Sequence, residues 1–150
     1  VGQVGWGKLR PTFLTPNEQY THVSLWCLWA SPLLIGAPVD QLDDFTLNLL
    51  TNDEVLEVNQ DPLCVQAQRL AKYGPMEVWG KPLEDGSLAV GIFNVGFETE
   101  AFTLKWADLG IHGPRKIRDL WRQQDLGTGQ DAFKTTVNRH GVVLLKLTKP

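Results

Sequence analysis

The sequence predicts a chain in two parts, an α/β portion followed by an all-β portion. In the first part, apolar residues recur at helical spacing, and Pro or Gly ends each run. From Met76 onward the apolar period changes to two, which is typical of half-buried strands. The two patterns meet near Tyr73, which precedes Gly and Pro. We therefore expect residues 1–72 to be an incomplete α/β unit and residues 73–150 to form an antiparallel β-sandwich.

The composition favours an ordinary globular chain. The 150 residues are 43% hydrophobic and 21% charged, with a formal net charge of −3. Lys and Arg are scattered, so charge gives no case for a nucleic-acid partner or an anionic membrane. The longest apolar run is interrupted by Pro32 and Gly36 and falls short of the ~18 residues that a membrane helix needs. We therefore predict neither a nucleic-acid partner nor a membrane span.

The cysteines and the first residues do not indicate whether the protein works in a reducing or an oxidising compartment. Cys27 and Cys64 lack CxxC or metal-ligand spacing, and Cys27 lies in an apolar run where a small buried side chain is expected. The chain opens at Val1, without an initiator methionine or a signal-peptide pattern. We therefore expect it to begin within a longer protein.

The first predicted helix follows an irregular loop. Glycines and Pro11 interrupt residues 1–14, and this loop carries one large aromatic side chain, Trp6. Thr15 then has the features of an N-cap, because a proline follows it and Glu18 completes a capping box. The helix is predicted to run to about Ser31.

The stretch THVSLWCLWASPLLIG (21–36) is apolar enough to require cover on several sides. Its end, residues 33–35, is apolar on both faces and is predicted to be a strand of a parallel sheet. Such a strand needs neighbours, yet the first 75 residues offer no partner strand. We therefore expect the earlier strands of this α/β domain to lie upstream.

Two shorter helices are expected next. Asp40 or Asp43 would cap the first, which carries apolar residues at helical spacing (Leu42, Phe45, Leu49 and Leu50). The pattern Thr-Asn-Asp-Glu at 51–54 resembles a second capping box and would start a helix over 55–60. An Asp-Pro pair at 61–62 would end it.

Short alternating segments separated by turn residues fill the second part. The predicted strands are 76–82, 87–95, 99–106, 115–122, 133–138 and 141–148. Because these strands are evenly spaced and have no helices between them, they favour an antiparallel sandwich.

The residues alone provide no catalytic set. The acidic pairs at 43–44 and 53–54 fall at predicted helix starts, where capping explains them better than catalysis. The three histidines have no ligand spacing, the serines have no GxSxG context, and the glycines of residues 1–7 do not follow a strand. We therefore predict no metal site and no cofactor.

Five of the six tryptophans fall into two groups. Those patterned as core residues are Trp26, Trp29 and Trp106. Trp6 and Trp79 are better placed to line a site, since aromatic side chains stack on sugars. The only candidate substrate-binding residue is Trp6.

Four stretches together resemble the C-terminal part of the α-galactosidase and α-N-acetylgalactosaminidase family of retaining glycoside hydrolases. They are VGQVGWG, THVSLWCLWASPLLIG, LLTNDEVLEVNQDPL and MEVWGKPLEDGSLAVGIFNVG. Their order and spacing also agree, and the resemblance covers essentially the whole chain.

The resemblance implies a fold and a division of labour. It implies the C-terminal end of a (β/α)8 TIM barrel in residues 1–72, followed by the β-sandwich. Residues 1–15 and 37–42 would be loops at the rim of the active-site face, with Trp6 in the first. The family's nucleophile, its acid/base aspartate and its main sugar-binding residues precede the point where this chain starts, so none is carried over to a residue here.

Two positions depart from the family pattern. Ala37-Pro38-Val39 follows the LLIG run where relatives have a short polar pair, which removes an expected sugar contact. Cys64 stands where a glycine is common, which is expected to alter only a turn.

These observations lead to a function with one alternative. We expect the C-terminal portion of an enzyme that removes terminal α-linked galactose from oligo- or polysaccharides, with the catalytic aspartates elsewhere and the isolated chain inactive. Its partners would be an α-galactoside and the missing N-terminal barrel portion or another chain. The resemblance favours a secreted or periplasmic location. The alternative is a non-catalytic carbohydrate-binding module, with aromatics such as Trp79 or Trp121, or a purely structural sandwich.

Overall fold

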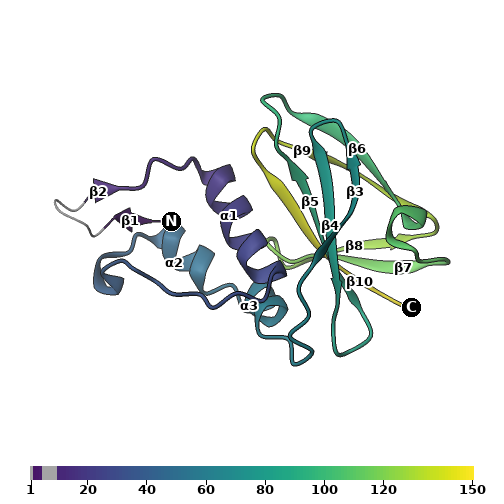
Figure 1. The fold of residues 1–150 in the computed structure, drawn as a ribbon, viewed down its shortest axis with the longest axis horizontal. Coiled ribbons are helices and arrows are strands. Elements are labelled where there is room, and N and C mark those ends of the chain that lie inside the picture. The colour runs from purple at the N-terminus through teal and green to yellow at the C-terminus, as the bar shows by residue number, and fades with distance from the viewer. Residues whose placement is uncertain (1, 5–9) are drawn as a thin grey trace.

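The computed structural model describes residues 2–4 and 10–150. Figure 1 shows helices on one side of the molecule and the strands of a β-sandwich on the other. The elements of the helical side are β1 (Gln3–Val4), β2 (Arg10–Pro11), α1 (Pro16–Leu28), the 3-10 helix η1 (Val39–Gln41), α2 (Asp44–Leu50) and α3 (Asp53–Asn59). β1 and β2 pair with each other as an antiparallel ribbon.

Antiparallel strands form the rest of the chain. In spatial order, the six-stranded sheet consists of β3 (Gln68–Tyr73), β4 (Met76–Pro82), β5 (Leu88–Asn94), β10 (Val142–Thr148), β7 (Arg115–Asp119) and β8 (Gln124–Gly129). The second sheet pairs β6 (Glu100–Lys105) with β9 (Ala132–Val137), and the 3-10 helix η2 (Trp106–Leu109) follows β6. Every pairing in both sheets is antiparallel. The predicted antiparallel sandwich is therefore confirmed.

Two strands of the large sheet, β3 and β8, lie outside the predicted set. Both are at the edges of that sheet, and nearly all their residues are exposed. An alternating pattern requires one buried face, so strands exposed on both faces do not produce it. Because β3 starts at Gln68, the large sheet begins before Tyr73, the expected boundary. The division into domains 1–72 and 73–150 stays a prediction.

The predicted strand 115–122 is too long. β7 ends at Asp119, because the Asp119 carboxylate accepts hydrogen bonds from both the backbone N–H and the guanidinium of Arg122. These two bonds close a turn that leads into β8. Side chain to backbone bonding of this kind competes with continued strand pairing.

One face of the large sheet packs against β6 and β9. The buried residues between the two sheets are Met76, Val78, Val90, Ile92, Phe102, Leu104, Trp106, Ile117, Val137, Val143, Leu145 and Leu147. Leu104 is fully buried and Trp106 is 2% exposed, so the expectation that Trp106 is a core residue is confirmed. This core comes entirely from the sandwich.

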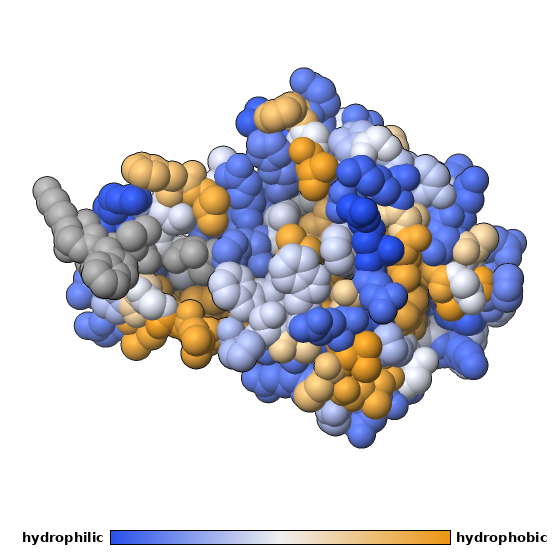
Figure 2. Space-filling model, in the orientation of Figure 1, coloured by the Kyte–Doolittle hydropathy of each residue, from blue (hydrophilic) through white to orange (hydrophobic). Residues whose placement is uncertain are grey.

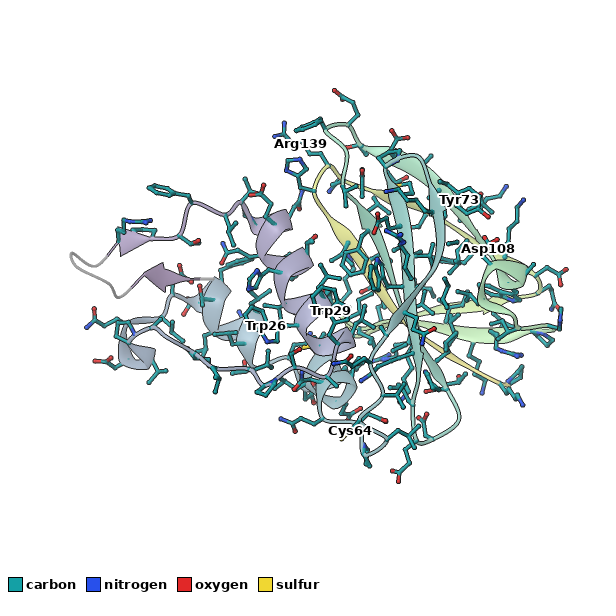
Figure 3. The ribbon with its side chains drawn as sticks, in the orientation of Figure 1. Trp26, Trp29, Cys64, Tyr73, Asp108 and Arg139 are labelled. Carbon is teal, nitrogen blue, oxygen red and sulfur yellow. The ribbon has the colours of Figure 1, made fainter. Side chains whose placement is uncertain are left out.

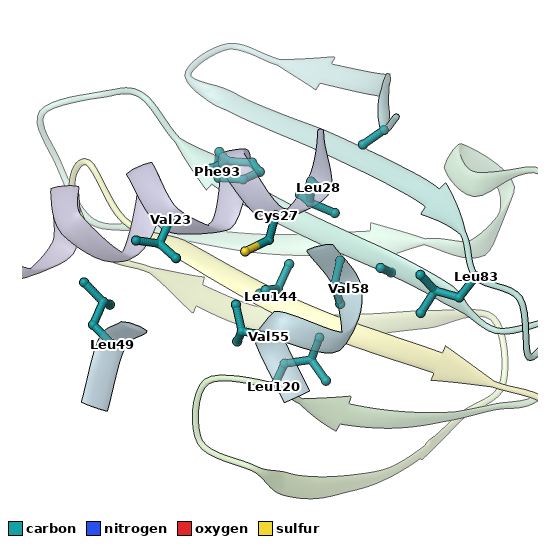
Figure 4. Packing of buried hydrophobic residues seen from close by; sticks show 12 residues of the cluster. Val23, Cys27, Leu28, Leu49, Val55, Val58, Leu83, Phe93, Leu120 and Leu144 are labelled. Carbon is teal, nitrogen blue, oxygen red and sulfur yellow. The ribbon is translucent and has the colours of Figure 1, made fainter. Parts of the chain in front are cut away.

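The opposite face of the same sheet packs against the helices. The buried residues here are Val23, Cys27, Leu28, Leu49, Val55, Val58, Ala67, Leu83, Ala89, Phe93, Leu120 and Leu144. Figure 4 shows side chains of α1 and α3 meeting those of β5 and β10. In β5, Gly91 lacks a Cβ that would lie 2.8 Å from Leu28 Cδ1. The glycine therefore allows α1 to approach the sheet closely.

Helix α1 starts as the sequence predicts and ends earlier. Thr15 and Glu18 form the expected capping box, with Pro16 at the first helical position. The helix ends at Leu28 instead of near Ser31. Ala30 adopts a φ of 50°, in the left-handed region that stops a helix.

The helices α2 and α3 have side-chain caps. Asp43 caps α2 by accepting from the Thr46 N–H at 2.7 Å, so Asp43 is the cap and Asp40 is not. Asn52 caps α3 by accepting from the Val55 N–H. Both acidic pairs therefore lie at helix starts, as expected: the first consists of the cap Asp43 and the first-turn residue Asp44, and the second, 53–54, lies in the first turn of α3.

The strand expected at 33–35 is absent from the described part of the chain, so that prediction is wrong for this structure. Residues 31–36 are irregular, Leu34 is 87% exposed and Ile35 is 49% exposed. A strand forms only where backbone groups find a partner. Among the residues that the structure describes, no strand pairs with this segment.

The expectation that Trp26 and Trp29 belong to the core is also wrong. They are 36% and 40% exposed. The face of α1 that meets the sheet carries smaller side chains, including Val23, Cys27 and Leu28. The two tryptophans flank that face: Trp26 lies in the last turn of α1, Trp29 is its C-cap, and Figure 3 shows both near the end of the helix.

Candidate functional site

The residue singled out from the sequence, Trp6, lies outside the described residues. Its position at the rim of a site therefore stays a prediction. Trp79 is half-buried and stacks edge-on against Trp29, with ring centroids 5.8 Å apart. Its Nε1 donates to Glu77. Trp79 thus lies on β4 and packs against Trp29 and the core between the helices and the sheet.

Two carboxylates of α3 accept hydrogen bonds from the sandwich. Glu54 accepts from Arg118 on β7, and this hydrogen bond raises the pKa of the Arg118 guanidinium. Asp53 accepts from the side chain of Gln123. A carboxylate bonded in this way holds α3 against the sandwich, which is a structural function.

Asp61 ties the end of α3 to the β4–β5 hairpin. Its two oxygens accept from the backbone N–H of Leu63 at 3.1 Å and of Glu84 at 2.9 Å. Near it lies the ammonium of Lys81, which is buried without a hydrogen-bond partner among the described residues. Burial lowers the pKa of Lys81, while the charge of Asp61 opposes that shift.

The two cysteines differ in environment. Cys27 is fully buried, and burial raises the pKa of its thiol to about 12. It is a small core residue, as expected. Cys64 is exposed and adopts a φ of 50°. That conformation favours glycine, which is consistent with the glycine implied there by the family resemblance.

No group of three or more His, Cys, Asp or Glu side chains is arranged to hold a metal ion within residues 2–4 and 10–150. Over the same residues, no helix combines the length and hydropathy of a membrane-crossing segment.

The start of α1 also contacts the sandwich. His140 pairs with Glu18 at 2.9 Å, and Asn17 donates to the Arg139 carbonyl. These contacts attach the start of α1 to the β9–β10 turn.

The most conspicuous surface feature is an apolar hollow of about 490 Å³ beside α1. It is lined by His22, Leu25, Trp26, Trp29, Ser31, Pro32 and Leu34. We call these seven residues the apolar hollow. Figure 2 shows hydrophobic surface along the lower edge of the helical side, and further hydrophobic patches over the sandwich. Contiguous apolar surface of this kind marks an interface.

Hydrogen bonds fix the wall of the apolar hollow. The indole of Trp26 donates to the Pro32 carbonyl at 3.0 Å, and Asn59 of α3 donates to the Ser31 carbonyl at 2.8 Å. His22 lies against Trp26 with ring centroids 4.7 Å apart, and burial lowers the pKa of His22. The segment 31–35 is therefore held in place although it pairs with no strand.

Residues 73–147 match the family model for the alpha galactosidase C-terminal beta sandwich domain. The chain belongs to this family. The match begins where β3 ends and covers the strands from β4 to β10. Its family membership agrees with the resemblance seen in the sequence.

Relatives extend the similarity into the helical part. The α-galactosidase of Coffea arabica is 36% identical over 137 residues, covering 90% of this chain and 36% of that protein. A probable α-galactosidase of Dictyostelium discoideum is 35% identical, covering 90% of this chain and 37% of that protein. The chain thus spans about a third of the length of these relatives.

Solved structures agree with the fold. A GH27 β-L-arabinopyranosidase from Geobacillus stearothermophilus has a TM-score of 0.91 and 32% identity, covering 99% of this chain and 35% of that one. The α-galactosidase I of Mortierella vinacea has a TM-score of 0.87 and 28% identity, covering 91% and 36%. Because these matches include the helices as well as the sandwich, they confirm the expected fold class.

Proposed function

We propose that this chain is the C-terminal portion of a retaining glycoside hydrolase that removes terminal α-linked galactose. The observation that carries the proposal is similarity to α-galactosidases over 90% of the chain, helices included, while only about a third of each relative is covered. In such an enzyme one carboxylate attacks the anomeric carbon and a second, ~5 Å away, protonates the leaving oxygen. We place both carboxylates outside this chain.

The environment of the described carboxylates supports that placement. Asp43 caps a helix, Glu54 pairs with an arginine, and Asp61 holds two backbone N–H groups. Each of these three carboxylates is occupied by a partner within the fold, so none of the three is free to act as a nucleophile or as a general acid.

The apolar hollow supports an incomplete barrel. We propose that residues 1–72 supply the closing elements of a (β/α)8 barrel, and that the rest of the barrel covers Trp26, Trp29 and Leu34. In the complete barrel, residues 33–35 gain the neighbouring strands that they lack here. Under this proposal Trp6 lies at the rim of the sugar site.

For the sandwich we propose a structural role. Residues in the middle of one face of its large sheet are buried against α1 and α3, so the sheet holds these helices in position. A carbohydrate-binding surface elsewhere on the junction is compatible with that role, and a specific observation for it is given below.

The test joins this chain to the N-terminal portion of the Coffea arabica enzyme that the similarity leaves uncovered. The 150-residue chain alone is expected to leave an aryl α-galactoside unchanged, whereas the joined protein hydrolyses it. Substituting Trp6→Ala in the joined protein should raise KM more than it lowers kcat. Turnover by the chain alone, abolished by replacing one of its own aspartates, contradicts the proposal.

A second measurement does not depend on the joined protein folding. The intact mass of the natural product, or of a chain that copurifies with it, should account for the first strands of a barrel. A natural 150-residue monomer that unfolds cooperatively without any partner would show that the helical part is complete.

A further inference from the structure

Two polar hollows meet at the junction between the helical part and the sandwich. The first, of about 180 Å³, lies between the start of α1 and the β9–β10 turn; its lining includes Asn17, Asp119, Arg122 and Asn138. The second, of about 440 Å³, lies between α2 and the β7–β8 turn; its lining includes Asn48, Thr51, Asn52, Asp53 and Gln123. Tyr20 and Trp121 line both hollows. We call the two together the junction groove.

The aromatic pair that joins the hollows is held rigidly. Tyr20 and Trp121 stack edge to face with ring centroids 4.7 Å apart, and Phe45 packs against the other side of Tyr20 at 5.6 Å. The indole Nε1 of Trp121 donates to the hydroxyl of Ser24, which is fully buried, at 2.8 Å. Rings fixed in this way make contact without losing rotamer freedom.

The charged groups of the junction groove are paired within it. Asp119, only 3% exposed, accepts from Arg122 through both carboxylate oxygens. Asp53 accepts from Gln123. An ionised carboxylate offers about four acceptor positions, so Asp119 retains capacity for further donors. The groove thus lacks the surplus positive charge that a phosphate site needs.

The remaining lining is mostly amide and hydroxyl. Among the bonds formed within the described residues, the amide of Asn17 donates only to the Arg139 carbonyl, which leaves its oxygen for a ligand. Asn48 and Asn138 are both exposed at the groove, one in each hollow. Amides provide donors and acceptors side by side, which suits adjacent hydroxyl groups. The part-exposed rings of Tyr20 and Trp121 add apolar aromatic surface, on which the C–H groups of a sugar ring can pack.

We propose that the junction groove binds a neutral oligosaccharide, with one sugar unit in each hollow and the Tyr20–Trp121 pair between them. The combined size of the hollows falls within the range of roughly 300–1,000 Å³ that is usual for small-ligand sites. The choice of a galactose-bearing polysaccharide as the ligand rests on the proposed function above. The groove itself requires only neutral hydroxyl-rich chemistry.

The experiment is affinity electrophoresis of the 150-residue chain in native gels containing galactomannan. Migration should be retarded relative to gels without polysaccharide, and retardation should saturate with galactomannan concentration. Free galactomannan oligosaccharides should reverse the retardation, whereas inorganic phosphate should not.

Two exposed substitutions test the placement of the ligand. Asn48→Ala and Asn138→Ala should each weaken the apparent affinity about threefold to tenfold, since each removes polar contacts in a different hollow. Leu34→Ala changes a side chain that is 87% exposed and lies outside the groove, and it should leave the affinity unchanged. All three variants should keep the wild-type circular dichroism spectrum, because the replaced side chains are exposed.

The outcomes separate this inference from the proposed function. Absence of saturable retardation, or retardation unaffected by both asparagine variants, overturns the groove as a sugar site. Reversal by phosphate overturns the neutral-ligand chemistry. Hydrolysis by the joined protein does not enter this measurement, so loss of one proposal leaves the other standing.

Discussion

The two faces of the six-stranded sheet are buried by different partners. One face meets β6 and β9, which belong to the same sandwich, and its core includes Leu104 and Trp106. The other meets α1 and α3, and its core includes Leu28 and Leu144. The sandwich therefore completes its own core, whereas the helices are covered on one side only. The position of the helices is determined by the sheet more than by neighbours of their own.

We expect the largest loss of stability when one leucine of either core is truncated. Leu28→Ala and Leu104→Ala each remove a fully buried side chain and should lower the free energy of unfolding by about 2–5 kcal/mol. Because the large sheet is shared by both cores, we expect one transition in urea followed by far-ultraviolet circular dichroism. If Leu28→Ala produces a separate early transition of the helices, the two parts do not unfold as one unit.

The next largest loss of stability is expected when a side chain is added at Gly91, where α1 lies close to the sheet. Gly91→Ala should destabilise the chain by about 1–3 kcal/mol, because the added methyl group meets Leu28 and Phe93. Gly36→Ala is the matched control, since no heavy atom outside its immediate chain neighbours lies within 4 Å of the added Cβ and its φ is not positive. Equal midpoints for the two variants in urea would show that α1 can move away from the sheet at little cost.

The hydrogen bond from Trp121 to Ser24, which joins the sandwich to α1, should contribute less to stability. Ser24→Ala leaves the Trp121 indole N–H without its acceptor, and the expected loss is about 1 kcal/mol in thermal unfolding. Ser24→Thr keeps a hydroxyl and serves as the comparison. An unchanged melting temperature for Ser24→Ala would mean that water replaces the serine oxygen.

An ion pair in the sandwich should make stability depend on pH. The hydrogen bond from Lys146 lowers the pKa of Asp85 from 3.8 to about 2. A lowered folded-state pKa stabilises the fold above about 3.8, and that contribution is lost as the pH falls toward 2. Asp85 is half-exposed, so the effect should stay below about 1 kcal/mol. Urea midpoints from pH 5 to pH 2 should fall less steeply in Lys146→Met than in the wild type.

The smallest effect on stability is expected on the uncovered side of the helices. Leu34→Ser changes a residue that is 87% exposed, so unfolding should shift by less than about 0.5 kcal/mol. The wild-type chain alone should self-associate through the apolar hollow, and Leu34→Ser should reduce this in sedimentation velocity. A wild-type chain that stays monomeric at all concentrations would contradict the interface assigned to this face.

Elements with one buried face or a recognisable cap could be predicted from the sequence. Strand β4 occupies 76–82 as expected, and the boxes or caps at Thr15 and Asp43 start their helices. The edge strands β3 and β8 could not be predicted, because neither has a buried face to produce alternation. The site was harder still: the junction groove combines Asn17, Asn48, Trp121 and Asn138, which no sequence spacing relates.

The sequence by itself determined the antiparallel sandwich, the first helix starts and the family, because periodicity, caps and motif order are local properties of the chain. Only the tertiary structure decided which face of α1 is buried: smaller residues such as Cys27 meet the sheet, while Trp26 stays at the surface. It also decided that residues 33–35 remain unpaired. The physical reason is the same in both cases, since an apolar helix or strand can be read from its own residues, but burial and pairing depend on which partners reach it.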